Sequence, residues 1–273
     1  MSIRPASLSI RPVSTMFVAL YGELALHPWR NPVAAESDAY SLFVARSSAM
    51  GWLADAAENG VGGVWGMNDA GQDPDGGSQP SCRVWFQVGL NAPIPAGQPL
   101  PVQAFLACAG DAVARMGILH LQGIQILLPV ERLSTRSSIE VRTLLGAAGW
   151  FADSNPRLRT RVRATVDGGQ DPSIRTAAPG MLQRMQKIRQ DIFACDSFSL
   201  TDDAVILQPA VINELWRGPA QHQVTFHGAL IEWSLDALGW LAAFLASASS
   251  QHGVSTPLML TVSRSEDAVA HVD

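Results

Sequence analysis

An internal repeat constrains the fold of this chain more than any other feature of its sequence. The hexamer Ala104–Ala109 (AFLACA) returns as Ala243–Ala248 (AFLASA) at an offset of 139 residues, with five identities in six. Upstream, Val84 and Phe86 recur as Val224 and Phe226 at an offset of 140 residues. Because these matches are collinear, they indicate that the chain contains one structural unit twice.

Each half of the sequence predicts the same order of elements, which is strand, helix, strand, strand, helix, strand. Alternating or continuously apolar segments predict strands, and apolar residues three to four apart predict helices. In the first half the elements are strands 15–23, 61–67, 83–90 and 119–130 and helices 37–59 and 101–116. In the second half they are strands 158–166, 197–207, 223–231 and 258–264 and helices 179–194 and 234–247.

This order predicts an α+β protein built from two tandem ferredoxin-like (βαββαβ) modules, 1–135 and 136–273, the second including a linker. Such a module places both helices on one face of a four-stranded antiparallel sheet and leaves the other face bare. Strand 15–23 is apolar on both sides, as a strand covered on both faces is. We therefore expect the two bare faces to pack sheet to sheet, an arrangement that resembles the internal pseudo-dimer of the dimeric α+β barrel superfamily. That resemblance concerns the fold and implies small-molecule oxygenases, cyclases or haem enzymes as relatives, without fixing a function.

Strand alternation selects the candidate site residues, which should leave the helix-packed core and face the bare side of each sheet. On two strands predicted to be neighbours, Arg161 and Arg163 should lie beside Thr225 and His227. Two arginines can bind an anionic group, and His227 is the candidate catalytic acid or base. From the first module, Trp85 and Arg83 should face this cluster as further ligand-binding residues. The alternative is that the polar face is simply solvated.

Composition narrows the classes of cofactor and partner. The net charge of −5 argues against nucleic acid or an anionic membrane surface, and no apolar run is long enough to span a membrane. The three cysteines form no CxxC pair and the histidines show no metal-ligand spacing, so we expect no metal and no cofactor. Without a secretion signal in the given sequence, a cytoplasmic location is expected.

Two functions are favoured from sequence. The first is a small-molecule enzyme or binding protein of the α+β-barrel type, which acts on a partly aromatic, anionic ligand without metal or nucleotide. The alternative is a non-catalytic protein–protein interaction protein, such as a toxin-neutralising immunity protein or an assembly subunit. A third, an RNA-processing protein with tandem ferredoxin folds, has only the arginine-rich run 157–163 in its support, and the overall acidity argues against it. The partner is thus a small molecule or a protein, and homo-oligomerisation stays open.

Overall fold

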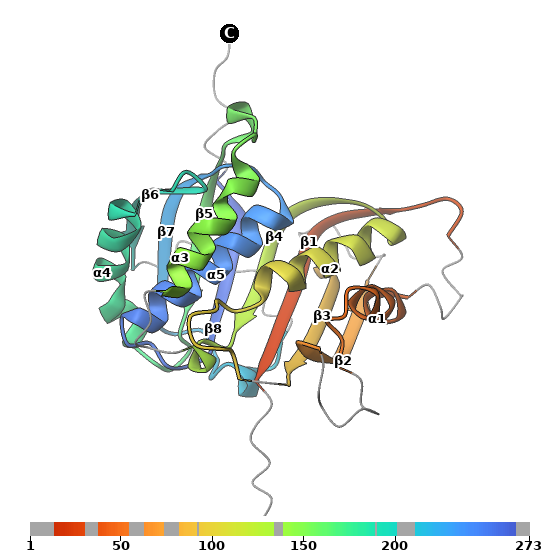
Figure 1. Cartoon of the computed structure of the whole chain (residues 1–273), viewed down its shortest axis with the longest axis horizontal. Helices are drawn as coiled ribbons and strands as arrows, with labels where there is room; N and C mark the ends of the chain where they lie inside the picture. The colour runs from red at the N-terminus through yellow and green to blue at the C-terminus, as the bar shows by residue number, and fades with distance from the viewer. Residues whose placement is uncertain are drawn as a thin grey trace, which may run out of the picture.

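A single antiparallel sheet of eight strands dominates the computed structural model (Figure 1). The structure describes residues 14–30, 38–54, 63–73, 82–91, 93–133, 139–188, 190–200 and 211–265. In chain order the strands are β1 (Thr15–Leu26), β2 (Trp65–Gln72), β3 (Cys82–Leu90), β4 (Gly117–Leu128), β5 (Thr160–Asp167), β6 (Phe193–Ser199), β7 (Gln223–Leu230) and β8 (Leu258–Arg264). Across the sheet their order is β2-β3-β1-β4-β8-β5-β7-β6, and the sheet is open.

Five α-helices lie on one side of this sheet (Figure 1). They are α1 (Ala39–Ala49), α2 (Val102–Met116), α3 (Ile139–Ala147), α4 (Ser173–Lys187) and α5 (Leu235–Gln251). The mixed α+β class is therefore confirmed. Within the described residues, none of these helices combines the length and apolar character that a membrane crossing requires.

The two halves of the chain share one strand order. The first half reads β4-β1-β3-β2 and the second β8-β5-β7-β6, so in each the fourth strand lies beside the first and the third beside the second. A helix follows the first and the third strand of each half. This is the order expected of βαββαβ modules. The duplication itself, and the division at 135/136, stay predictions.

The predicted sheet-to-sheet packing is wrong, because the halves join edge to edge. Strands β4 and β8 pair antiparallel from Gly123–Ser263 to Leu128–Leu258, which makes one continuous sheet instead of two stacked ones. Each of these strands would otherwise be the edge of its own half, with a row of unpaired backbone groups. Their pairing satisfies both rows at once, so the described strands form one open sheet and not a barrel around a cavity.

The two-sided apolar character of β1 has a different cause from the one expected. Its Met16, Val18 and Leu20 side chains join the core beneath the helices. On the opposite face Phe17, Ala19 and Tyr21 form a smaller cluster with Leu127, Met259, Val211 and Trp216. Val211 and Trp216 both belong to the connection between β6 and β7. These residues cover the face of β1 that the second module was expected to cover.

The repeated hexamer lies where the two long helices meet. Ala104–Ala109 falls in α2 and Ala243–Ala248 in α5, and the two helices pack against each other. Their backbones approach closely at two glycines: a Cβ atom at Gly239 would lie 3.0 Å from the Cα atom of Gln103, and one at Gly110 would lie 2.8 Å from the Leu235 side chain. Small residues permit this approach, and fourteen of the seventeen residues of α5 are buried.

Two segments near the second sheet edge differ from their predicted assignments. Helix α4 begins at Ser173 and contains Pro179, which was expected to start it. Residues 193–194, expected to end that helix, instead begin β6. In the first half, α1 ends at Ala49, before the end of the helix predicted at 37–59, of which residues 37 and 55–59 lie outside the described residues. Strand β8 has the predicted bounds, and β3 and β7 differ from theirs by one residue.

Candidate functional site

The face of the sheet without helices, called here the helix-free face, carries a row of polar side chains over β8, β5, β7 and β6. Arg163 is the direct cross-strand partner of His227 on β7 and of Ser263 on β8, and His227 is in turn the partner of Ser197 on β6. A neighbouring row contains Thr261, Thr165, Thr225 and Ser199. The structure therefore brings Arg163, Thr225 and His227 together on adjacent strands.

The charged residues of this face differ in their partners. The Arg161 guanidinium, about half exposed, forms an ion pair with Asp196 of β6. His227 lies with its Nε2 atom 3.1 Å from the Ser199 hydroxyl. Among the described residues Arg163 has no ion-pair partner, and its buried Nε atom has no hydrogen-bond partner there. Arg163 is consequently a group on this face with unused capacity to bind an anion.

The threonines of the neighbouring row are already engaged with each other. The hydroxyls of Thr165 and Thr225 lie 2.9 Å apart, and both residues are buried. Toward the first half, the Gln125 amide donates to the Thr261 hydroxyl at 3.4 Å and accepts from the Tyr21 hydroxyl at 2.7 Å. These bonds fix Thr225 in place, so it supports the row of Arg163 and His227 by position.

Trp85 and Arg83 do not join this cluster. Both lie on β3, which is separated from β5 by β1, β4 and β8, a span of roughly 19 Å at the usual strand spacing. Trp85 stacks on Phe17 at 5.9 Å between ring centroids. Arg83 is buried and donates from Nε to the Gly22 carbonyl at 2.7 Å. The expected aromatic wall across a domain interface is thus absent from the described site, because that interface does not form.

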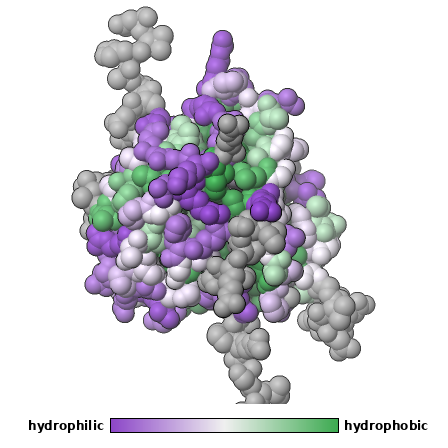
Figure 2. Space-filling model, turned by 60° about the vertical axis from the view of Figure 1, so that its left-hand side comes forward, coloured by the Kyte–Doolittle hydropathy of each residue, from purple (hydrophilic) through white to green (hydrophobic). Residues whose placement is uncertain are grey.

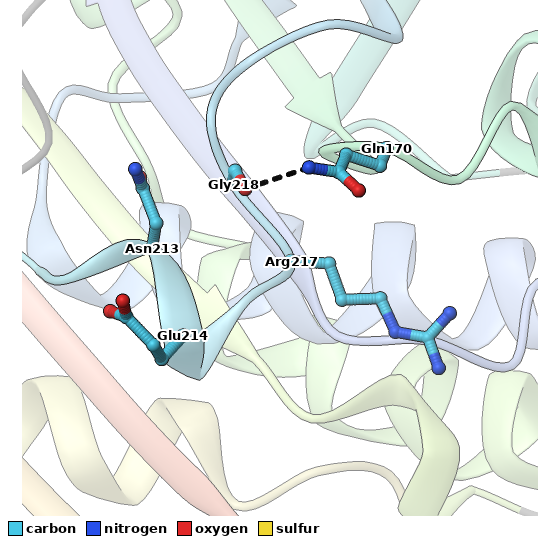
Figure 3. Close-up of a pocket in the computed structure, with 5 residues that line it drawn as sticks. All are labelled: Gln170, Asn213, Glu214, Arg217 and Gly218. Atoms are coloured by element: carbon cyan, nitrogen blue, oxygen red, sulfur yellow. Dashed lines mark hydrogen bonds between the residues drawn. The ribbon is translucent and has the colours of Figure 1, made fainter.

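A second, unpredicted feature is a pocket of about 520 Å³ at the end of the sheet where β5 finishes and β7 begins (Figure 3). Its lining consists of residues from two loops, namely Gln170, Asn213, Glu214, Arg217 and Gly218. The loops are held together by Gln170, whose backbone N–H donates to Arg217 at 3.0 Å and whose side chain donates to Gly218 at 3.4 Å. Figure 3 shows Glu214 and Asn213 on one side of this contact and the Arg217 side chain extending away from them.

The backbone of these loops explains their shape. Gly169 adopts a φ of 60°, and a Cβ atom there would lie 2.3 Å from the Arg217 carbonyl oxygen, so only glycine fits. Arg217 itself has a φ of 64°, a conformation that costs energy in a residue other than glycine. The Gly168-Gly169 pair in the sequence signals the turn, whereas nothing in the sequence around Arg217 indicates its conformation.

Two carboxyl groups, Asp167 and Asp171, lie on the loop that carries Gln170, one before it and one after it. Burial raises the pKa of Asp167, although its carboxylate accepts a hydrogen bond from the Gly169 N–H at 2.7 Å. For Asp171 burial acts in the same direction, but hydrogen bonds from Ser173 and Thr256 and the charge of Arg217 outweigh it and lower the pKa. The positive charge of Arg217 thus already acts on one carboxyl group of the protein, that of Asp171. The described residues contain no group of His, Cys, Asp and Glu side chains that could hold a metal ion.

Comparison of the chain with protein-family models, with curated proteins and with solved structures finds no match. Any function must therefore be argued from the residues themselves.

Proposed function

We propose that this protein binds an anionic group, a carboxylate or phosphate, on the helix-free face at Arg163, with Arg161 and His227 beside it. The observation that carries the proposal is the Arg163 guanidinium: within the part of the chain that the structure describes, its buried Nε atom has no hydrogen-bond partner, and no acidic residue forms an ion pair with it. Leaving a buried donor unpaired costs about 1–3 kcal/mol, and a bound oxyanion would recover that cost.

The neighbours of Arg163 suit the same ligand chemistry. A guanidinium presents its donors in a planar fork that matches two oxygens of a carboxylate or phosphate. His227 lies directly across on β7, and its imidazole ring offers nitrogen atoms that can donate or accept a hydrogen bond to the same ligand. Ser263 and Ser197 continue the row on either side with hydroxyl groups that can accept or donate hydrogen bonds.

A catalytic role for His227 is a finer proposal than binding. Its Nε2 atom is within hydrogen-bond distance of Ser199, so the ring is oriented, as a general acid or base needs to be. The chemistry proposed is proton transfer to or from a small anionic ligand. Trp85 no longer has a part in it, because it lies over the other half of the sheet.

The test of binding is a calorimetric titration of the full chain with pyrophosphate and, separately, with benzoate. We expect Arg163→Gln to weaken binding by roughly 10- to 100-fold, the range for a lost charged hydrogen bond. Arg159→Gln is the matched control, since Arg159 is exposed and precedes β5. Equal affinities for both variants would contradict the proposal.

A second candidate function is non-catalytic binding of a partner protein. It is favoured by the open sheet, on which Arg161, Arg163 and His227 lie along a strand surface and not inside an enclosed cavity. In this case a carboxylate of the partner would take the place of the small anion. A complex that Arg163→Gln disrupts, together with no response to either small probe, would favour this candidate.

We also propose that the two halves are copies of one ferredoxin-like module. The support is their common strand order and the packing of the repeated hexamers in α2 against α5. In this arrangement the anion site uses the second copy alone, since β5, β6, β7 and β8 all belong to it.

A further inference from the structure

Strand β6 forms one edge of the sheet, and α4 lies along that edge (Figure 1). An edge strand directs half of its backbone N–H and C=O groups away from the sheet, where another strand can pair with them. Figure 2, which brings this side forward, shows hydrophilic residues around a smaller apolar area. Unless its outward backbone groups are already bonded, such an edge can associate with another chain.

Side chains of α4, and of Gln190 after it, bind backbone groups of β6 at Phe193 and Asp196. Gln190 binds Phe193 twice: its Nε2 donates to the Phe193 carbonyl, and its Oε1 accepts from the Phe193 N–H at 2.8 Å. Gln186 donates to the Asp196 carbonyl at 3.3 Å. Arg175 donates to the carbonyl of Leu200, just beyond the strand, at 2.8 Å.

The direction of these bonds follows from the pairing of β6 with β7. The Ile192 carbonyl accepts from the Ile231 N–H at 2.7 Å, so the backbone carbonyl of Ile192 points toward the segment that continues β7. In an antiparallel pair the next residue, Phe193, then directs both its N–H and its C=O outward. A side-chain amide that donates to and accepts from the same residue occupies the position that the peptide group of an added strand would take.

We propose that the side-chain amides of Gln186 and Gln190 close the β6 edge against strand addition by a second copy of this chain. The second copy is the partner at issue because its own β6 presents the same outward groups and extends the same sheet when two such edges meet. The device is an intramolecular contact that competes with association, and it is independent of the anion site proposed above.

The first experiment measures the mass of the full-length protein by light scattering over a range of concentrations. We expect the Gln186→Ala/Gln190→Ala variant to shift toward a larger species than the wild type at the same concentration. Gln183→Ala is the matched control, because Gln183 is an exposed glutamine on the same helix and forms none of these bonds. A double variant with the same mass as the wild type at every concentration would overturn the proposal.

The second experiment reads the contact directly in the folded wild type by hydrogen exchange. The outward Phe193 amide should be protected, and Gln190→Ala should speed its exchange by roughly tenfold, as the loss of one hydrogen bond predicts. An unprotected Phe193 amide in the wild type would refute the proposed closure. If the alanine variant unfolds, Gln186→Lys/Gln190→Lys serves in its place. It keeps donors for the Phe193 and Asp196 carbonyls, loses the acceptor for the Phe193 N–H and adds positive charge to the edge, and the charge should keep the wild-type mass. A larger species would count against the mechanism.

Discussion

The hydrogen bond from Tyr21 to Gln125 offers the sharpest test of how the helix-free face is built. The Tyr21 hydroxyl donates to Gln125 Oε1 at 2.7 Å, and the two residues are only 3% and 2% exposed. The amide cannot simply turn to compensate, since its Nε2 donates across the joint between the halves to Thr261. Tyr21→Phe removes the donor and keeps the ring that packs against Trp216 and Met259.

The expected cost follows from these contacts. A typical hydrogen bond contributes about 1 kcal/mol net, and a buried acceptor that loses a donor adds a desolvation cost, so we expect Tyr21→Phe to lower the free energy of unfolding by about 1–2 kcal/mol. Urea unfolding followed by tryptophan fluorescence measures it, and the eight tryptophans of the chain supply the signal.

The chain has one other tyrosine, Tyr40, which is 40% exposed on α1 and serves as the control. Tyr40→Phe should change stability by less than about 0.5 kcal/mol. Combining Tyr21→Phe with Gln125→Leu tests the pair itself, since residues that interact directly are expected to be non-additive by at least about 0.5 kcal/mol. Additive effects, or a Tyr21→Phe variant as stable as Tyr40→Phe, would refute the reasoning.

Two further predictions concern titration. The cysteines should react slowly with iodoacetamide at pH 8 in the folded protein, because the thiolate is the reactive form. Burial raises the pKa of Cys82 and Cys108 to about 11 and that of Cys195 to about 12. Labelling of the folded protein as fast as that of the protein unfolded in urea would contradict this prediction. For Asp167, burial holds the folded-state pKa above the ordinary value near 4, so its contribution to stability should fall as pH rises from the unfolded-state pKa through the folded one. The unfolding free energy of the wild type minus that of Asp167→Asn should therefore decrease as pH rises over this interval. An increase would show that the sign is wrong.

Local patterns in the sequence predicted most elements and the order of strands within each half, but not how the halves combine. Alternation identified Arg163 and His227 as neighbours on one face, because period two fixes the side of a strand that each residue occupies. The same reasoning could not reveal that β4 pairs with β8, since backbone pairing at a strand edge leaves no mark in side-chain periodicity. The apolar Phe17 and Tyr21 indicated a cover without identifying it, and the cover includes Val211 and Trp216 from the loop between β6 and β7.

The sheet-end pocket was out of reach of sequence reasoning for a related reason. Gln170 and Arg217 are brought together by loops that lie far apart in the chain, and the left-handed conformation of Arg217 is set by these tertiary contacts. Only Gly169 carried a local signal, because its backbone needs a positive φ. Loop positions of this kind depend on the finished fold.

The position of β8 in the middle of the sheet has a consequence for how the protein is made. This strand is the last of the described strands to be synthesised, yet it holds β4 on one side and β5 on the other. Until residues up to Arg264 have left the ribosome, β4 and β5 each keep an open edge that a neighbouring nascent chain could join. Because both pairings link segments distant in sequence, they should also form slowly. The centre of the native structure is therefore the most exposed part of the molecule during its biosynthesis, which predicts that chains lacking β8 would aggregate through those two strands.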